Sequence, residues 1–236
     1  MSSRNIFDSF NNAINGIIYG IKTERNLKIH CVAALGVLLL SLFYDFSRLE
    51  LLILVVTIML VFVAELMNTA IEKVVDMLVD TYHPLAKIAK DTAAGAVLIA
   101  AVNALVVAYI LFFSKPRLIN SLVNLFDKVR QTPLHIGFIS LLIVLILTFL
   151  IKGFYDSGTP LKGGIVSGHS ALAFSITTTV CFITRSPIII TLSLLLSLMV
   201  AQSRIESKIH STIQVVVGAL LGTVVTLFLF SLSNIA

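Results

Sequence analysis

The sequence predicts an all-α, polytopic membrane protein with about seven transmembrane helices. Hydrophobic residues make up 58% of the 236 residues and charged residues only 12%, whereas soluble domains average about 45–50% and about 25%. The apolar residues also lie in runs close to the length of about 20 residues that crosses a bilayer. Such runs form helices, because hydrocarbon offers no water to satisfy backbone polar groups. With 12 Gly, 5 Pro and 2 Cys, the composition further excludes collagen-like, disordered and disulfide-rich chains.

Seven apolar runs predict three spans in the first half of the chain and four in the second. They lie at about residues 29–44, 49–70, 92–113, 134–151, 168–184, 187–202 and 211–233. The second expected helix continues past its apolar run through the sequence MNTAIEKVVDMLVD. We therefore expect this helix to project out of the bilayer.

Two further segments are amphipathic, and we expect both to form helices in the membrane interface. Residues 5–22 place Phe and Ile on one stripe opposite Asn and Lys, and residues 117–130 place charged residues opposite an apolar stripe. The second segment separates the spans into two groups. The sequence thus divides into an N-terminal domain at 1–113, an interfacial linker at 114–133 and a C-terminal domain at 134–236.

The net charge of +5 belongs to basic residues that flank the apolar runs. This pattern is typical of membrane orientation and lipid headgroup contact and argues against nucleic acid as a partner. Counting the crossings places residues 72–91, 152–169 and 203–210 on one side of the membrane. That side has 11 of the Lys and Arg residues and the other has 6. The positive-inside bias therefore predicts that these segments and the N-terminus are cytoplasmic.

One helix face in the first half carries Glu65, Asn68, Glu72 and Asp76, which helical periodicity brings together. Glu65 follows the uncharged stretch 51–64, and an ionisable group at such depth usually marks a site. A solvated helix end would explain the outer charges but not Glu65.

Other ionisable residues flank this face: Glu24 precedes the first span, and Lys90 and Asp91 begin the third. Carboxylates beside a lysine at a membrane surface suit Mg²⁺ with a nucleotide phosphate. One remaining carboxylate at depth could accept the proton of a lipid hydroxyl. The sequence has neither a Walker loop nor a protein-kinase motif, so phosphoryl transfer would not use a familiar nucleotide fold.

Residues 5–113 resemble the small bacterial membrane kinases of the diacylglycerol kinase and undecaprenol kinase family. The matching pieces are the amphipathic N-terminal helix, ERN-x-KIH at 24–30, E-x-x-N-T-A-I-E-x-x-x-D at 65–76 and AKDTAAGAVL at 89–98. The segment HPLAKIAKDTAAGAVL at 83–98 is closer to the undecaprenol kinase branch of this family than to the diacylglycerol kinase branch. The resemblance implies ATP as substrate, a membrane lipid partner, a homotrimer with sites between subunits, and the plasma membrane of a bacterial-type cell.

The same resemblance implies roles for individual residues. Glu65 would be the general base on the lipid hydroxyl, and Glu24 and Glu72 would hold Mg²⁺. The residues expected to contact ATP are Asn68, Asp76, Lys90 and Asp91.

The second half carries KGGIVSGHSA at 162–171 and SRIESKIH at 203–210, each at the start of an apolar span. Two histidines with Lys, Arg and glycine amides around a phosphate could hydrolyse a phosphomonoester. Either histidine alone would be read as an ordinary helix-end residue. Their joint occurrence favours a phosphatase site.

These residues resemble the type 2 phosphatidic acid phosphatase family, whose pattern is K-x6-R-P, P-S-G-H and S-R-x5-H-x3-D. The resemblance implies His210 as nucleophile and His169 as acid. It implies a phosphate cradle of Lys152, Ser167, Gly168 and Arg204, with Lys162 as a further cation. This sequence departs from the pattern at Thr159, Val166 and Gln214, which replace arginine, proline and aspartate.

Together the two halves predict an ATP-dependent lipid kinase, with undecaprenol favoured over diacylglycerol, fused to a lipid phosphate phosphatase-like module. Gln214 leaves open a kinase with a catalytically degenerate phosphatase module. A transporter or a non-enzymatic adaptor is the alternative from another class. A transporter would spread ionisable residues through several spans, whereas here they concentrate at helix ends.

Overall fold

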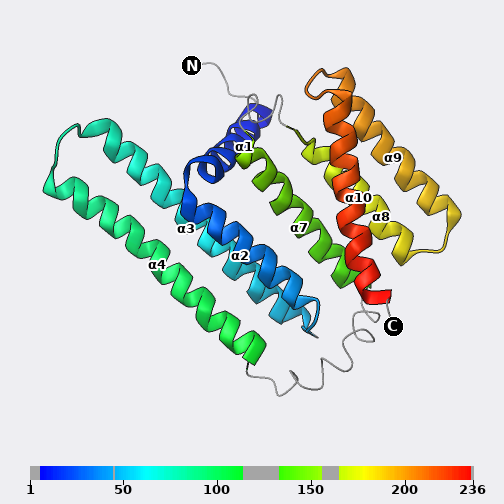
Figure 1. The fold of residues 1–236 in the computed structure, drawn as a ribbon, viewed down its shortest axis with the longest axis horizontal. Coiled ribbons are helices and arrows are strands. Elements are labelled where there is room, and N and C mark those ends of the chain that lie inside the picture. The colour runs from blue at the N-terminus through cyan, green and yellow to red at the C-terminus, as the bar shows by residue number, and fades with distance from the viewer. Residues whose placement is uncertain (1–5, 45, 114–132, 156–164, 235–236) are drawn as a thin grey trace.

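The computed structural model describes residues 6–44, 46–113, 133–155 and 165–234. All regular elements in these ranges are helices, as the sequence predicts (Figure 1). In chain order they are α1 (Ile6–Thr23), α2 (Arg25–Ser41), α3 (Arg48–Leu78), α4 (Pro84–Phe113), α7 (Pro133–Phe154), α8 (Gly168–Ile183), α9 (Pro187–Glu206) and α10 (Thr212–Asn234). The amphipathic helix expected at 117–130 and Lys162 lie outside the described residues.

Within the described residues, five helices are long and apolar enough to cross a membrane, namely α3, α4, α7, α9 and α10. The chain is therefore a multi-pass membrane protein. α8 matches an expected span but has only 16 residues, and α2 has 17. At 1.5 Å per residue these two reach about 24–26 Å, short of a hydrocarbon core of about 30 Å. Seven spans remain a prediction, of which five meet the criteria for length and composition.

The first half begins with the amphipathic α1, where the sequence predicts a helix. Ile18 and Ile21 on its apolar stripe are buried. α3 begins with a capping box, because Ser47 Oγ accepts from the Glu50 amide and the Glu50 carboxylate accepts from the Ser47 amide. α3 then runs unbroken for 31 residues, through both its apolar run and the polar segment that follows.

α4 begins eight residues before the apolar run that predicts it. Proline is favoured in the first helical turn, and Pro84 is the first residue of α4. His83 Nδ1 accepts a hydrogen bond from the Leu85 amide at 3.3 Å and so satisfies one open donor of that turn. Lys90 and Asp91 consequently lie inside α4.

In the second half, α8 packs closely against α10. A side chain at Gly218 would meet the backbone of Ser167, and one at Gly222 would meet the backbone of Ala171. This spacing of small residues lets membrane helices approach at backbone distance. Ser175 and Thr226, both fully buried, add a hydrogen bond of 2.7 Å between the two helices.

The two halves share one hydrophobic core. α1 and α2 both pack against α7, and a buried cluster joins residues of the first half, such as Leu27 and Leu38, to Ile139 and Leu150 of α7. Gly153 near the end of α7 leaves the space that the Ile21 side chain fills.

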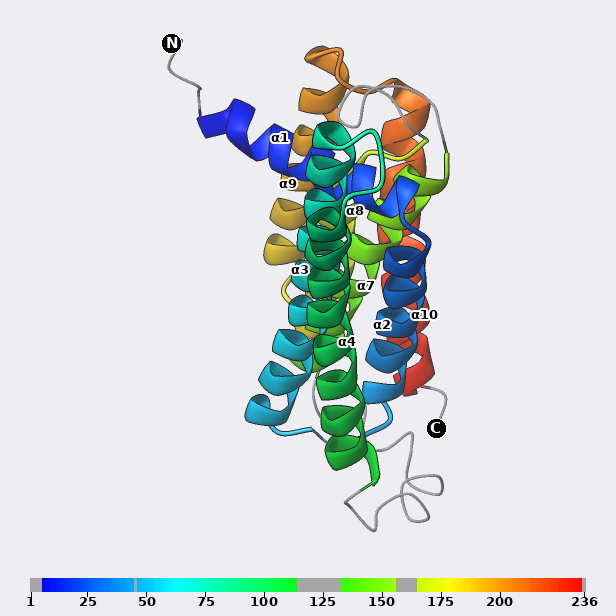
Figure 2. The same cartoon turned by 90° about the vertical axis from the view of Figure 1, so that its left-hand side faces the viewer.

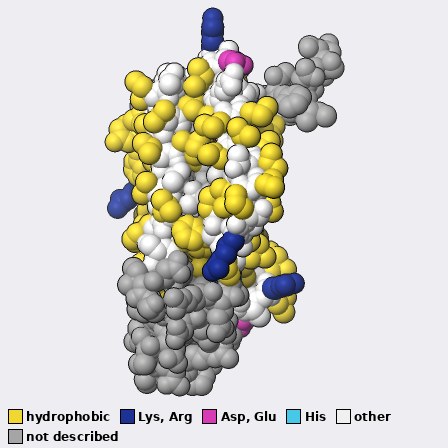
Figure 3. Space-filling model, turned by 90° about the vertical axis from the view of Figure 1, so that its right-hand side faces the viewer, with side chains coloured by type: hydrophobic (Ala, Val, Ile, Leu, Met, Phe, Trp, Pro, Cys, Tyr) yellow, Lys and Arg dark blue, Asp and Glu magenta, His cyan; other side chains and the backbone are white. Residues whose placement is uncertain are grey.

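Figure 2 shows the α3–α4 turn, the end of α7 and the α9–α10 turn at the same end of the bundle. The segments that carry the expected site residues therefore lie at one end, as the count of crossings predicts. The face on the right of Figure 1 is covered largely by hydrophobic side chains (Figure 3). On α9 the exposed side chains include Ile188, Leu192, Leu196 and Met199, which suits contact with lipid.

Candidate active sites

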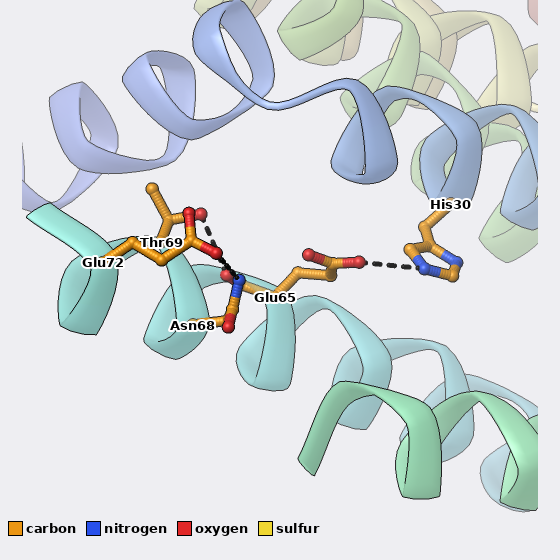
Figure 4. Close-up of polar contacts among 5 residues, drawn as sticks. All are labelled: His30, Glu65, Asn68, Thr69 and Glu72. Carbon is orange, nitrogen blue, oxygen red and sulfur yellow. Dashed lines mark hydrogen bonds and ion pairs between the residues drawn. The ribbon is translucent and has the colours of Figure 1, made fainter. Parts of the chain in front are cut away.

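The deepest ionisable contact in the first half joins α2 to α3. Glu65 is only 2% exposed, and its Oε1 lies 3.0 Å from Nε2 of His30 (Figure 4). The hydroxyl of Thr69 donates to the backbone carbonyl of Glu65 at 3.0 Å. The sequence analysis assigned no role to His30, although the motif ERN-x-KIH ends on it. Its position at the start of the apolar run 29–44 was the available signal.

A second polar contact lies one turn further along α3. The Asn68 side-chain amide donates to Glu72 Oε1 at 2.9 Å (Figure 4). The carboxyl groups of Glu24 and Glu72 both act electrostatically on Glu65. The assignment of Glu65 as base and of Glu24 and Glu72 as metal ligands stays a prediction.

A third contact lies between the outer parts of α3 and α4. Lys90 forms an ion pair with Asp76, and both side chains are substantially exposed. The exposed Asp91 follows Lys90 on α4. The face that the sequence predicts on α3 therefore carries a buried acid, a middle amide–carboxylate pair and an outer ion pair.

The donor set fits Mg²⁺ in the way that this ion accompanies nucleotides. Mg²⁺ keeps several waters and uses one or two carboxylates plus substrate phosphates. Glu24 and Glu72 provide two carboxylates. Among the described residues no three or more His, Cys, Asp or Glu side chains form a metal cage. The two carboxylates would need phosphate oxygens to complete a site.

An apolar cavity of about 100 Å³, open on one side, lies among α2, α3 and α4. Its lining is almost entirely aliphatic and aromatic, and small residues such as Ala34 and Ala108 leave the space. Its polar members are Thr57 and His30. Because His30 also contacts Glu65, the cavity adjoins the buried carboxyl.

The second site centres on His210 in the α9–α10 turn. Its side chain is buried, and Nδ1 lies 3.0 Å from Oε1 of Gln214. The same Gln214 oxygen accepts from the Ser211 amide at 3.0 Å. Burial lowers the pKa of His210 below its ordinary value, and the charges of Lys152 and Arg204 lower it further, while the Gln214 contact opposes them.

The start of α8 is tied to this turn. The buried Ser167 donates its backbone N–H to the carbonyl of Gln214 at 3.0 Å and accepts the Ser170 hydroxyl at 3.0 Å. Gly168 opens α8, and the exposed His169 follows it.

Charges from two other helices face the two histidines. Lys152 of α7 and Arg204 of α9 act electrostatically on both His169 and His210. The Arg204 Nε is buried, and among the described residues it has no hydrogen-bond partner. The structure thus brings Lys152, His169, Arg204 and His210 within electrostatic reach of one another, and the Arg204 Nε leaves a donor for an anion.

Comparison with known proteins finds one family match in each half of the chain. The family model of prokaryotic diacylglycerol kinase matches residues 11–112. An undecaprenol kinase of Bacillus subtilis (strain 168) is 43% identical over 109 residues, which are 46% of this chain and 89% of that protein. The chain belongs to the prokaryotic diacylglycerol kinase family.

Other members of this kinase family match the same half. A diacylglycerol kinase of Synechocystis sp. is 43% identical over 104 residues, 44% of this chain and 59% of that protein. The diacylglycerol kinase of Escherichia coli (strain K12) is 37% identical over 83 residues, 35% of this chain and 68% of that protein. No solved structure matches the chain.

The PAP2 superfamily model matches residues 148–235. The kinase-family half is therefore fused to a PAP2 phosphatase-like half, and both resemblances drawn from the motifs are confirmed. The PAP2 match includes Lys152, His169, Arg204 and His210, the residues that the structure gathers at the second site.

Proposed function

We propose that the first half transfers the γ-phosphoryl group of ATP to the hydroxyl of a membrane lipid alcohol. This proposal rests on the buried Glu65, which lies at membrane depth beside an apolar cavity. From Glu65 the polar face of α3 continues out of the apolar region. A solvated helix end has no reason to bury a carboxyl group, since burying an ionisable group costs several kcal/mol.

In the proposed reaction, Glu65 takes the proton of the lipid hydroxyl while that oxygen attacks the γ-phosphorus. The bond from the γ-phosphorus to the ADP oxygen breaks. Asn68, Asp76, Lys90 and Asp91 contact the nucleotide in this proposal. Glu24 and Glu72 hold Mg²⁺, which would neutralise phosphate charge.

Undecaprenol is the proposed lipid in preference to diacylglycerol. The Bacillus subtilis undecaprenol kinase and the Synechocystis diacylglycerol kinase are both 43% identical to this chain, so the preference rests on the segment HPLAKIAKDTAAGAVL. The almost entirely apolar cavity lining suits a hydrocarbon chain.

The second half is proposed to be a lipid phosphate phosphatase, because Gln214 holds His210 in a competent tautomer. If Nδ1–H donates to Gln214 Oε1, Nε2 keeps its lone pair for attack on phosphorus. The bond to the lipid oxygen breaks as His169 gives that oxygen a proton. Water then hydrolyses the phosphohistidine and releases inorganic phosphate. Lys152, Ser167, Gly168 and Arg204 would bind the phosphate, and Lys162 would add charge.

We further propose a homotrimer in the plasma membrane with the N-terminus in the cytoplasm. The trimer rests on the family resemblance. The orientation is supported by the Lys and Arg bias and by the need of the kinase for cytosolic ATP.

The test is a radiolabelled ATP assay with the purified full chain in detergent micelles, offering undecaprenol and diacylglycerol in parallel. We expect label in undecaprenol, and we expect Glu65→Gln to reduce its incorporation by about 10²–10⁴-fold, the usual contribution of a general base. Glu206→Gln, an exposed acid of α9, is the matched control and should keep wild-type incorporation. No label in either lipid would contradict the kinase proposal. A transporter or adaptor has no reason to phosphorylate lipid at all.

A chase with unlabelled ATP tests the second half. Label should leave the lipid as inorganic phosphate in the wild type and should stay in the lipid in His210→Gln. Label that is equally stable in both proteins would indicate a PAP2-like half that is inactive toward the kinase product.

A further inference from the structure

We propose that His30 is a positioning residue for the kinase reaction, orienting Glu65 through its Nε2 so that the second carboxylate oxygen faces the lipid hydroxyl. This inference rests on the proposed kinase function. His30 comes from α2 and Glu65 from α3, so the contact also fixes how these two helices present the site (Figure 4).

The geometry gives the two Glu65 oxygens different tasks. Oε1 lies 3.0 Å from His30 Nε2, which leaves Oε2 to accept a proton. His30 borders the apolar cavity, and its side chain is 25% exposed against 2% for Glu65. A lipid whose chain fills the cavity would therefore reach the pair with its hydroxyl.

The surrounding charges explain why Glu65 needs a partner. A base must be ionised before it can accept a proton, and burial disfavours a carboxylate. Of the titratable groups that act on Glu65, Glu24 before α2 and Glu72 on α3 are like charges that also disfavour it. His30 from α2 supplies the favourable contact, with its Nε2 3.0 Å from Oε1 of Glu65.

His30 keeps its own proton in this scheme. Nε2–H points to Oε1 before and after transfer, while Oε2 gains the lipid proton as the oxygen–phosphorus bond forms. Hydrogen bonds to a charged group are stronger than those between neutral groups. The contact therefore favours the ionised form of Glu65 as well as its orientation.

The experiment compares kcat, the KM for ATP and the pH–rate profile of three variants in the micelle assay. His30→Leu removes the donor, and we expect kcat to fall at least tenfold at neutral pH with the KM for ATP unchanged. Part of this loss should recover as pH rises, because the acid limb set by Glu65 moves to higher pH. A merely structural role would lower activity equally at every pH.

His30→Gln keeps an N–H donor near the same place and should restore kcat to within a few-fold of the wild type. His83→Asn removes a histidine in the α3–α4 turn while keeping an acceptor for the cap of α4, and it should match the wild type.

Should His30→Leu fail to fold, His30→Gln decides, since a folded but equally inactive Gln variant would overturn the proposal. An unchanged kcat and pH profile in His30→Leu would overturn it too. Failure of the wild type to phosphorylate any lipid would instead refute the kinase function itself.

Discussion

At the scale of single residues, Gln214 decides how the second site works. It stands four residues after His210, where the family pattern has aspartate, and its Oε1 lies 3.0 Å from Nδ1. A neutral amide oxygen can hold the imidazole tautomer, but it cannot stabilise the positive charge that forms on attack. Burial, Lys152 and Arg204 lower the pKa of His210 and so favour its neutral, nucleophilic form, while the Gln214 contact opposes them.

We predict that Gln214→Asp raises the pKa of His210 and speeds phosphate release. The reaction needs neutral His210, so its rate falls as pH drops through this pKa. A higher pKa therefore moves the acid limb to higher pH. Above that limb the rate should rise roughly tenfold, because a hydrogen bond to a charged partner exceeds a neutral one by about 1–1.5 kcal/mol.

The measurement is the pH profile of phosphate release from labelled lipid. Gln202→Asp on the exposed face of α9 is the control, and superimposable Gln214→Asp and wild-type profiles would contradict the prediction.

At the scale of elements, the apolar runs locate every described helix from α2 onward, and the amphipathic stripe locates α1, but the runs do not always mark where a helix ends. α4 starts eight residues early because an apolar run marks only the part of a helix inside hydrocarbon, whereas Pro84 and His83 set the true start in the headgroup region. α3 is predicted more closely, since its charged end keeps the same helical period. The period also places Glu65, Asn68 and Glu72 on one face.

Contacts between elements lie beyond what one sequence offers. Periodicity says which face of α3 carries Glu65, but not that α2 would bring His30 to it. In the second half, the family pattern shows only that Gln214 replaces the aspartate of the site. The structure shows that the Gln214 side chain still contacts Nδ1 of His210, four residues earlier in the chain. Which helices pack together depends on side-chain fit, such as the close approach of α8 at Gly218 and Gly222.

This close approach yields a prediction about α10. Gly218→Ala places a methyl group against the Ser167 backbone, which cannot move without displacing the start of α8. We expect the overpacking to cost about 1–3 kcal/mol and to lower phosphate release strongly while lipid phosphorylation continues. Gly36→Ala on α2 meets open space and should leave both activities intact. Equal loss of both activities in Gly218→Ala would show that the halves fail together rather than separately.

At the scale of the whole molecule, both sites lie at one end of a bundle whose halves share a core. A phosphatase site at the kinase end would act on lipid phosphates of the same leaflet. The kinase product is such a lipid, so the two halves would set its level in opposite directions. A substrate in the outer leaflet would require the opposite orientation of the second half.

The orientation itself gives the last prediction. Tyr155 directly follows α7 and Glu206 ends α9, both at the end that carries the two sites, whereas Arg185 precedes α9 at its opposite end. In a Cys31→Ala, Cys181→Ser background, Tyr155→Cys and Glu206→Cys should resist a membrane-impermeant maleimide in intact cells and react after permeabilisation. Arg185→Cys should react from outside. Outside labelling of positions 155 and 206 would place the kinase residues away from cytosolic ATP, since the fold keeps both sites together. In that case the orientation and the ATP-dependent function could not both hold.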